Sequence, residues 1–266
     1  MNSHNTQKKV NSQSNKDEIG NIVSFWKNPG ETLAILLRRF REEHHLSEED
    51  KLTYAGRLDP MAEGIVPLLV GAARFQKDHM LGAAKTYELD ILLGIGTDTG
   101  DMLGLITLNP TLSLSARSDL AKIQAILPTL QNVTELPYPH YSSRPVDGMP
   151  LFMHARAGTK VKVPIKKVMI HSLELQEIKT VSLNELLDAA IVIIKKVQGD
   201  FRQEEIIEQW MKMREMDGDR LISIVTIRTT VSSGTYMRSL AEKLGELLGI
   251  PALAYRIKRT AIEGVE

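Results

Sequence analysis

The chain has 266 residues, which is long enough for one large domain or two small ones with a substantial core. Lys plus Arg and Asp plus Glu number 33 each, so net charge gives no argument for a nucleic-acid partner, and any such argument must be local. Cysteine is absent, which excludes disulfide scaffolds and thiol chemistry and is consistent with a reducing cytosol. No apolar run approaches the roughly 20 residues that span a bilayer, and the polar start lacks the apolar core of a signal peptide.

The predicted elements begin after a polar N-terminal stretch. Residues 1–20 are rich in Asn, Ser, Gln and Lys and cannot bury enough apolar surface to become ordered, so we predict a disordered tail followed by one domain over residues 21–266. Residues 33–40 carry apolar side chains at helical spacing, which predicts a helix. After a short buried segment, apolar side chains alternate along one face of a predicted strand at Tyr87, Leu89, Ile91 and Leu93.

The second half of the chain mixes elements of several kinds. Residues 134–167 are irregular, rich in Pro, Gly, His and Tyr, and contain six basic side chains against two acidic ones. Two amphipathic helices separated by Gly199 are predicted within residues 180–217. A strand, a helix and an extended basic segment complete the chain. Because strands and helices do not alternate strictly and no repeat is visible, the sequence favours an α+β fold around one sheet.

The stretch GRLDPMAEG, residues 56–64, retains charged residues between apolar segments. Asp59 is expected at the edge of the core, where a carboxylate needs a cationic partner or several hydrogen-bond donors. The alternative is a simple turn in which Asp59 accepts a bond from its own backbone. Arg238, early in the helix after SSGT, is a candidate partner, and a solvated helix charge is the alternative for it. SSGT itself can cap the helix or form an anion site at its N-terminus.

Other motifs give weaker signals. Asp98 and Asp101 in GTDTGD can bind a divalent metal through oxygen, but the spacing differs from a calcium loop and no phosphate-binding GxxxxGK accompanies it, so a structural turn is favoured. The seven histidines form neither HxxxH nor HExxH. GxSxG and GxGxxG are also absent, so the sequence gives no support for serine-hydrolase or dinucleotide chemistry.

Five stretches, in the same order, resemble the motifs of the TruB-type tRNA pseudouridine synthases. YAGRLDPMAEGIVPLL is similar to the family's GHxGTLDPxAxGVLPV. WKNPGETLAILLRRFR is similar to its KPxGxTS opening, and AKTYELDILLGIGTDTGDMLG to KxYxxxxxxGxxTDTxDxxG. PYPHYSSRPVDGMPLFMHARAG is similar to PPxYSAxKxxGxxxYxxARxG, and VSSGTYMRSLAEKLGELLG to CSSGTYIRSLAxDLGxxLG. The resemblance extends over about residues 22–264.

The resemblance implies a pseudouridine synthase fold, with a mixed, mainly antiparallel central sheet flanked by helices and loops. It implies that residues 134–167 form a basic thumb-like loop over the RNA and that about residues 180–217 are a helical insertion. It also implies a short form without the C-terminal PUA domain of longer members, which would bind RNA more weakly.

The resemblance also assigns roles to individual residues. Asp59 falls on the catalytic aspartate, Tyr87 on the tyrosine that stacks on the target base and is implicated in proton transfer, and Arg238 on the arginine that pairs with the aspartate. The residues implied to bind substrate or RNA are Lys27, Tyr54, Arg57, Tyr141, Arg144, Arg156, Ile257, Lys258 and Arg259. Tyr54 replaces the motif histidine, Arg57 replaces the motif threonine, and Arg144 lies one place early, which leaves substrate choice and affinity open.

The implied activity converts a uridine in the T-loop of tRNA, at position 55, into pseudouridine by cleaving the N-glycosidic bond and rejoining the base through C5. Such a reaction needs no redox partner or energy source, so neither a cofactor nor a metal is expected. The expected partner is the T-arm stem-loop of tRNA, and the expected form is a cytoplasmic monomer without membrane contact. Two alternatives stay open: a non-catalytic tRNA-binding chaperone on the same fold, and a metal-dependent phosphotransferase that uses Asp98 and Asp101.

Overall fold

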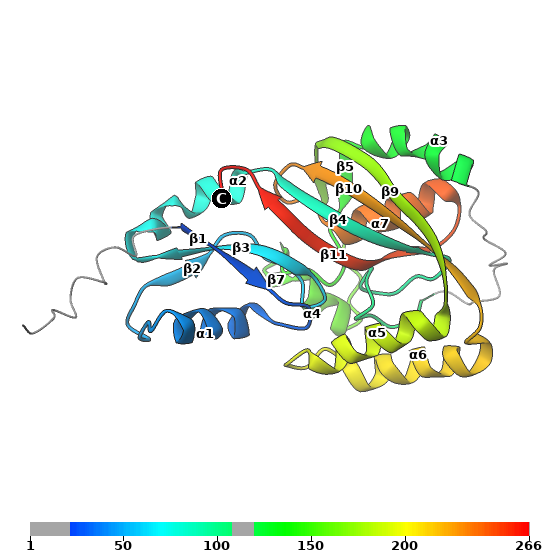
Figure 1. Cartoon of the computed structure of the whole chain (residues 1–266), viewed down its shortest axis with the longest axis horizontal. Coiled ribbons are helices and arrows are strands. Elements are labelled where there is room, and N and C mark those ends of the chain that lie inside the picture. Colours follow the sequence, from blue (N-terminus) through cyan, green and yellow to red (C-terminus); the bar gives the residue numbers. More distant parts are fainter. Residues whose placement is uncertain (1–21, 108–119, 266) are drawn as a thin grey trace, which may run out of the picture.

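The computed structural model describes residues 22–107 and 120–265, so the predicted tail at residues 1–20 lies outside the described part (Figure 1). One seven-stranded sheet, in the order β1-β3-β11-β4-β10-β9 with β2 beside β3, organises the molecule. Its strands are β1 (Ile22–Lys27), β2 (Leu52–Tyr54), β3 (Glu63–Val70), β4 (Lys85–Leu93), β9 (Ile170–Ser182), β10 (Leu221–Val231) and β11 (Ala252–Ile262).

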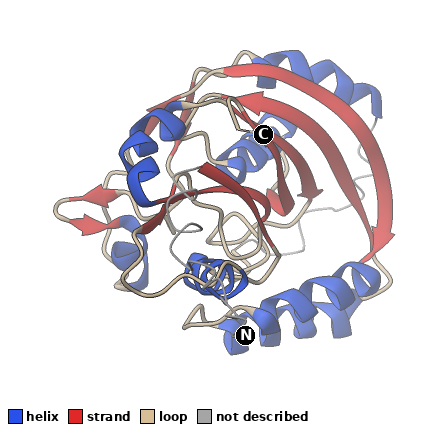
Figure 2. Ribbon diagram, turned by 60° about the vertical axis from the view of Figure 1, so that its left-hand side comes forward, coloured by secondary structure: helices blue, strands red, loops and turns tan. Residues whose placement is uncertain are grey.

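Strand directions in the sheet are mixed. Every neighbouring pair is antiparallel except β3 and β11, which run parallel. The α+β class with a mixed, mainly antiparallel central sheet is therefore confirmed. Figure 2 shows that the sheet is strongly curved, with helices on its two sides.

The helices include those predicted from apolar periodicity. Those at residues 33–40, within 180–217 and after SSGT are all present. Each helix in the described part of the chain is too short or too polar to cross a membrane. The helices are α1 (Leu33–Glu43), the 3₁₀ helix η1 (Gly71–Gln76), α2 (Lys77–Gly82), α3 (Leu120–Gln131), α4 (Leu151–Arg156), α5 (Leu183–Lys196), α6 (Gln203–Asp217) and α7 (Met237–Leu248).

Alternation along β4 divides the core between the two faces of the sheet. Leu89, Ile91 and Leu93 pack in one hydrophobic cluster with the apolar side chains of α3 and α7, whereas Leu92 packs in a second cluster with α5 and α6. Tyr87 belongs to the first cluster, so the strand face predicted from the sequence is confirmed.

Gly64 allows β3 and β11 to approach each other closely. It pairs with Arg259 across the parallel strands and has a φ of +124°. A Cβ atom at this position would lie 2.2 Å from the carbonyl oxygen of Arg259, closer than real Cβ atoms come. The strand pair therefore requires glycine, and it fixes the segment before β3 beside β11.

Helices α5 and α6 form a hairpin that lies beneath the sheet in Figure 1. Ser182 caps α5 by accepting a hydrogen bond from the backbone N–H of Glu185 at 3.2 Å. The apolar stripe of α5 and the buried Trp210 of α6 fill the space between the two helices and the sheet. Strand β9 continues to Ser182, so the helical part of the segment predicted at residues 180–217 begins at Leu183.

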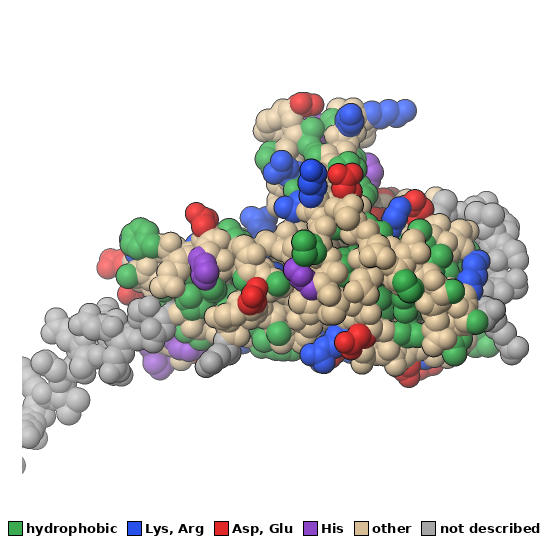
Figure 3. Space-filling model, turned by 90° about the horizontal axis from the view of Figure 1, so that it is seen from above, with side chains coloured by type: hydrophobic (Ala, Val, Ile, Leu, Met, Phe, Trp, Pro, Cys, Tyr) green, Lys and Arg blue, Asp and Glu red, His purple; other side chains and the backbone are tan. Residues whose placement is uncertain are grey.

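The basic region at residues 134–167, here called the arm, contains only short elements. Figure 2 shows a short two-stranded hairpin extending from the body of the molecule, and Figure 3 shows Lys and Arg side chains gathered on a projecting part. Antiparallel pairing joins the two ends of the arm, and a second short pair precedes α4. The strands of the arm are β5 (Glu135–Pro137), β6 (Pro145–Val146), β7 (Met149–Pro150) and β8 (Ile165–Lys167).

Candidate active site

A pocket of about 760 Å³ opens where segments far apart in the sequence meet. The loop before β3, strands β4 and β11, the start of α7, the arm and the loop between α5 and α6 all contribute to its wall. Asp59, Tyr87, Arg238 and Ile257 line it together. The structure thus brings into one cavity four residues that come from four different elements.

Asp59 and Arg238 form a two-point ion pair at the wall of this pocket. Arg238 donates from Nε to Asp59 Oδ2 at 2.8 Å and from Nη2 to Asp59 Oδ1 at 3.1 Å. The Arg238 side chain is only 4% exposed, whereas the Asp59 side chain is 32% exposed. The carboxylate therefore faces the cavity while the guanidinium lies behind it, and the contact predicted from the sequence is present.

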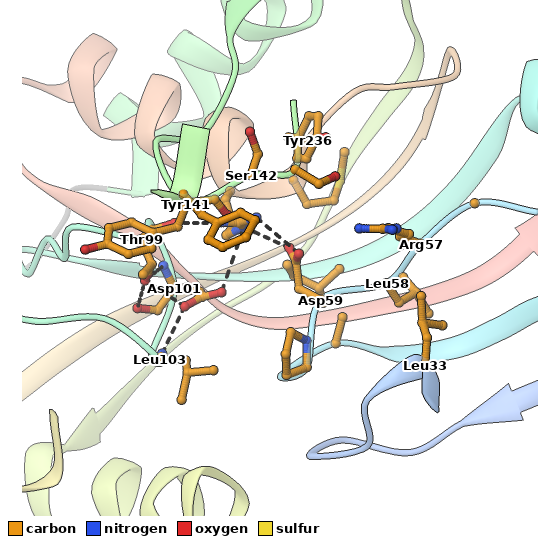
Figure 4. A pocket seen from close by; sticks show the side chains of 18 of the residues that line it. Leu33, Arg57, Leu58, Asp59, Thr99, Asp101, Leu103, Tyr141, Ser142 and Tyr236 are labelled. Atoms are coloured by element: carbon orange, nitrogen blue, oxygen red, sulfur yellow. Dashed lines mark hydrogen bonds and ion pairs between the residues drawn. The ribbon is translucent and has the colours of Figure 1, made fainter. Parts of the chain in front are cut away.

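Backbone carbonyls hold the remaining donors of Arg238. Its Nη1 donates to Thr99 O at 2.8 Å and to Tyr141 O at 3.3 Å, and its Nη2 also donates to Tyr141 O at 3.3 Å. Figure 4 shows Asp59, Thr99, Asp101 and Tyr141 converging on the same part of the pocket wall. Since each edge of the guanidinium has an acceptor, the side chain is held in one orientation.

Asp101 is a second carboxylate close to Arg238. Its Oδ2 lies 3.8 Å from Arg238 Nε, and its Oδ1 accepts from Thr99 Oγ1 at 2.8 Å and from Leu103 N at 2.9 Å. Burial raises the pKa of the Asp101 carboxyl to about 6, although Arg238 acts in the opposite direction. Burial also tends to lower the pKa of Arg238, but Asp59 and Asp101 outweigh it and hold that pKa above its ordinary value.

Lys27 holds the loop that carries Asp59, which corrects the expectation that it binds RNA. Its side chain is fully buried, and Nζ donates to Pro60 O at 3.1 Å and to Ala62 O at 2.6 Å. Burial lowers the pKa of its amine to about 8. A lysine enclosed in this way cannot reach RNA phosphates, and its contacts instead stabilise the turn in which Ala62 N donates to Asp59 O.

Arg259 has a similar position on the other side of this loop. It is 1% exposed, and its guanidinium donates to Ile65 O at 2.7 Å, Gly56 O at 3.1 Å and Arg57 O at 3.4 Å. Arg259 also belongs to the wall of the pocket, but its guanidinium is bonded to backbone carbonyls, so a role in binding substrate or RNA stays a prediction.

Tyr87 and Ile257 supply an apolar part of the pocket wall. They lie on the paired strands β4 and β11, where Ile257 is opposite Leu89 and Arg259 is opposite Tyr87. Tyr87 is 7% exposed and Ile257 is 6% exposed, and both line the cavity. A flat aromatic face and an aliphatic side chain can hold a planar ring without fixing it by hydrogen bonds.

The other predicted binding residues divide into two groups. Tyr54, Arg57, Tyr141 and Arg156 line the pocket, and Figure 4 shows Arg57 beside Leu58 at its edge. Two residues do not line it. Arg144 is exposed on the arm with its guanidinium 5.2 Å from the ring centre of Tyr138, and Lys258 donates to Glu88 Oε2 at 3.0 Å.

The sequence predicts Asp98 and Asp101 only as turn residues or metal ligands. Asp98 accepts two hydrogen bonds from Arg202, at 2.7 and 3.2 Å, and Asp101 faces Arg238. Within residues 22–107 and 120–265, no group of three His, Cys, Asp or Glu side chains is arranged to hold a metal. The TDTGD motif indicated Asp101 as a candidate residue. No signal in the sequence indicated that Arg202 and the α5–α6 loop would line the pocket.

Comparison with known proteins identifies relatives of this chain. A family model described as "TruB family pseudouridylate synthase (N terminal domain)" matches residues 44–191. The chain is 31% identical to "tRNA pseudouridine synthase B" of Geobacillus thermodenitrificans, over 79% of this chain and 57% of that protein. It is 33% identical to the protein of the same name from Aromatoleum aromaticum, over 80% of this chain and 54% of that protein. The chain therefore spans about half the length of the curated relatives it matches.

The fold is also shared with a solved structure. A chain of "Crystal Structure of a Cbf5-Nop10-Gar1 Complex" matches with a TM-score of 0.53 and 18% identity, covering 92% of this chain and 49% of that chain. At this identity the likeness concerns the fold alone, and it agrees with the pseudouridine synthase fold expected from the sequence. Because the family model matches more than half of its residues, the chain belongs to the TruB family of pseudouridylate synthases.

Proposed function

We propose that this protein converts a uridine in the T-loop of tRNA, at position 55, into pseudouridine. The observation that carries the proposal is the Asp59 carboxylate, ion-paired to the buried Arg238 at the wall of a pocket that Tyr87 and Ile257 also line. Membership of the TruB family supports the reaction, and similarity to proteins named tRNA pseudouridine synthase B supports tRNA as the substrate.

The proposed reaction breaks the bond between C1′ and N1 of the uridine, turns the free uracil and forms a bond between C1′ and C5. The proton on C5 leaves and N1 gains a proton, so the product is an isomer of the substrate. Asp59 acts on the sugar, either as a nucleophile at C1′ or as a base. Both routes need a negatively charged carboxylate, and the two hydrogen bonds from Arg238 stabilise that charge. The chemistry calls for no cofactor or metal.

The uracil has to stay in the pocket while it turns. Tyr87 provides an aromatic face for stacking, and Ile257 provides an apolar wall that forms no hydrogen bond to oppose rotation. The target nucleoside must leave its stack in the RNA before it can enter, as in other enzymes that modify a base. The volume of about 760 Å³ lies in the usual range for small-molecule pockets.

The arm is the proposed site of contact with the T-arm stem-loop. Arg144 is exposed on it and Arg57 is exposed at the pocket edge, where these cations can approach RNA phosphates, and Arg156 is exposed on it as well but pairs with Asp200 at 3.0 Å. We assign residues 21–266 to one catalytic domain, with the arm as its thumb and about residues 180–217 as a helical insertion. We also propose that the protein is a monomer that acts on tRNA in the cytoplasm.

Release of tritium from tRNA labelled at uracil C5 tests the proposal. The wild type should release label, and Asp59→Asn should release it at least about a hundredfold more slowly, because an amide is neither nucleophile nor base. Asp90→Asn is the matched control. Asp90 is a half-buried carboxylate on β4 that accepts from Thr226 Oγ1, and it does not line the pocket, so the control should retain the wild-type rate.

Equal rates for the wild type and Asp59→Asn would contradict the assignment of Asp59. Binding of tRNA by the wild type without release of label would favour the chaperone alternative. A rate unchanged by EDTA would dismiss the metal-dependent alternative.

A further inference from the structure

The loop between α5 and α6, residues 197–202, forms a fixed wall of the Asp59 pocket. Asp200, Phe201 and Arg202 all line the cavity. Gln203 holds the loop, because its Nε2 donates to Val197 O at 2.9 Å and to Gly199 O at 2.8 Å while its Oε1 accepts from Phe201 N at 2.9 Å. The helical hairpin thus presents an ordered loop to the site.

Arg202 has an unusual backbone conformation in this loop. Its φ of 62° and ψ of 30° lie in the left-handed region, which residues other than glycine rarely adopt and which persists only when the surrounding structure enforces it. The side chain is 20% exposed and makes two contacts at once. The guanidinium donates twice to Asp98 and lies 4.5 Å from the ring centre of Tyr141.

The two partners of Arg202 belong to the segments that hold Arg238. Asp98 directly precedes Thr99, whose carbonyl accepts from Arg238 Nη1, and the carbonyl of Tyr141 accepts from both Nη1 and Nη2. Arg202 therefore contacts the side chains of two segments, and the backbone carbonyls of the same two segments orient Arg238. The contacts continue from Arg238 to Asp59 without interruption.

We propose that Arg202 is a positioning residue for the reaction, and that the α5–α6 hairpin is thereby a working part of the active site. Arg202 fixes the position of the Asp98–Thr99 segment and of Tyr141. Through them it fixes the orientation of the Arg238 guanidinium that donates two hydrogen bonds to Asp59. It acts through these neighbours and not on the substrate. The inference rests on the proposed pseudouridine synthase activity, which supplies the reaction that it serves.

The separation of kcat from KM on a T-arm stem-loop RNA tests this role. Arg202→Ala should lower kcat about tenfold, since a small misplacement of a catalytic group is costly, and should change KM by less than about threefold. Arg202→Lys should recover part of kcat, because it keeps the cation but loses the fork and the flat stacking face.

Arg214→Ala is the matched control, on the helix that directly follows Arg202. Arg214 joins α6 to α5 by donating to Asn184 Oδ1 at 2.9 Å and to Asp188 Oδ1 at 2.8 Å, and it does not line the pocket. Its replacement should lower the melting temperature but leave kcat within about twofold of the wild type. A loss of kcat as large as that of Arg202→Ala would reduce Arg202 to a structural role and overturn the inference.

Asp98→Asn provides a second route to the same contact. An asparagine oxygen can still accept from Leu105 N, as Asp98 Oδ1 does at 2.8 Å, so the loop should fold while the charge facing Arg202 is lost. If the two residues act together, the double variant should lose no more activity than the worse single variant. If the fold-loss of activity in the double variant equals the product of the two single losses, the inference is overturned.

The outcomes separate the inference from the activity on which it rests. A wild type that releases no tritium from labelled tRNA overturns the proposed function itself. An active wild type with an unchanged kcat in Arg202→Ala overturns the inference alone. A raised KM with an unchanged kcat would mean that Arg202 binds the RNA directly, which also overturns the positioning role.

Discussion

Lys27 and Arg259 hold the loop that carries Asp59 from its two ends. Lys27 donates to the carbonyls of Pro60 and Ala62, which follow Asp59, and Arg259 donates to those of Gly56 and Arg57, which precede it. Both side chains are almost entirely buried. Burying two cations costs free energy, so their place beneath a single short loop indicates that the position of Asp59 is tightly specified.

Lys27 should make stability depend on pH in the alkaline range. Burial lowers the pKa of its amine to about 8 in the folded state, against an ordinary value of 10.5. Between these values the folded protein binds fewer protons than the unfolded chain, so stability should rise with pH. The free energy of unfolding of the wild type, relative to Lys27→Met, should increase by up to about 1.4 kcal/mol per pH unit from about pH 8 to 10. Urea unfolding at several pH values measures this difference between the wild type and Lys27→Met. A difference that stays constant with pH would contradict the prediction.

Asp101 should have the opposite effect in the acidic range. Burial raises the pKa of its carboxyl to about 6 from 3.8, so between these values the folded protein binds more protons than the unfolded chain. Its contribution should be fully present below about pH 3.8 and lost as pH rises through about 6. The stability of the wild type relative to Asp101→Asn should fall over this range in urea titrations. A rise over the same range would show that the carboxyl stays ionised.

Arg238→Lys should abolish most activity while leaving the fold intact. A lysine places one point charge where the arginine fork contacts both oxygens of Asp59, so the carboxylate loses its fixed orientation. We expect kcat to fall by about a hundredfold in the tritium assay. Circular dichroism and a thermal melt provide the control, since global unfolding of the variant would assign Arg238 to a structural role.

Gly64→Ala should destabilise the protein strongly. The new Cβ would meet the carbonyl oxygen of Arg259 at 2.2 Å, and the φ of +124° is unfavourable for alanine, so we expect a loss of about 3 kcal/mol or more. Gly158→Ala is the control. Gly158 also has a positive φ, of +66°, but nothing lies within 4 Å of its Cβ position, so the loss should be only about 1 kcal/mol. Similar melting temperatures for the two variants would contradict the close approach of β3 to β11.

Arg144→Ala should weaken RNA binding in a manner that depends on salt. Arg144 is exposed on the arm, and losing one phosphate contact should reduce the slope of log K against log salt by about 1. Arg220→Ala is the control, because Arg220 pairs with Asp217 at the far end of α6. Fluorescence anisotropy of a labelled stem-loop measures RNA binding by both variants at several salt concentrations. An unchanged slope for Arg144→Ala would remove this residue from the proposed RNA surface.

Local pattern was sufficient to predict several parts of the structure. The period-two alternation through Leu89 and Ile91 predicted β4, and the apolar stripes predicted α5 and α6, because each signal lies within one element. The contact between Asp59 and Arg238 was predictable because a carboxylate at the edge of the core needs a cation and because the motifs around both residues match one family.

The rest depended on tertiary contacts that one sequence does not reveal. Arg259 lies in a basic stretch that resembles a surface, and Lys27 is a single cation at the end of an edge strand, so only the folded structure shows that both are enclosed. The contact of Arg202 with Asp98 joins residues 104 positions apart and requires the α5–α6 hairpin to fold back over the pocket. No local pattern encodes such a distance, which is why the contribution of this loop was missed.

The position of β11 has a consequence for how the chain folds during translation. This strand, Ala252–Ile262, lies between β3 and β4, so the ribosome must translate as far as residue 262, long after β3 and β4 have been made, before the middle of the sheet can close. Until then β3 and β4 each expose an unpaired edge, and such edges favour aggregation of nascent chains. Arg259 and Ile257 arrive on this same strand, so the pocket wall and the central hydrogen-bond ladder are completed in a single late event.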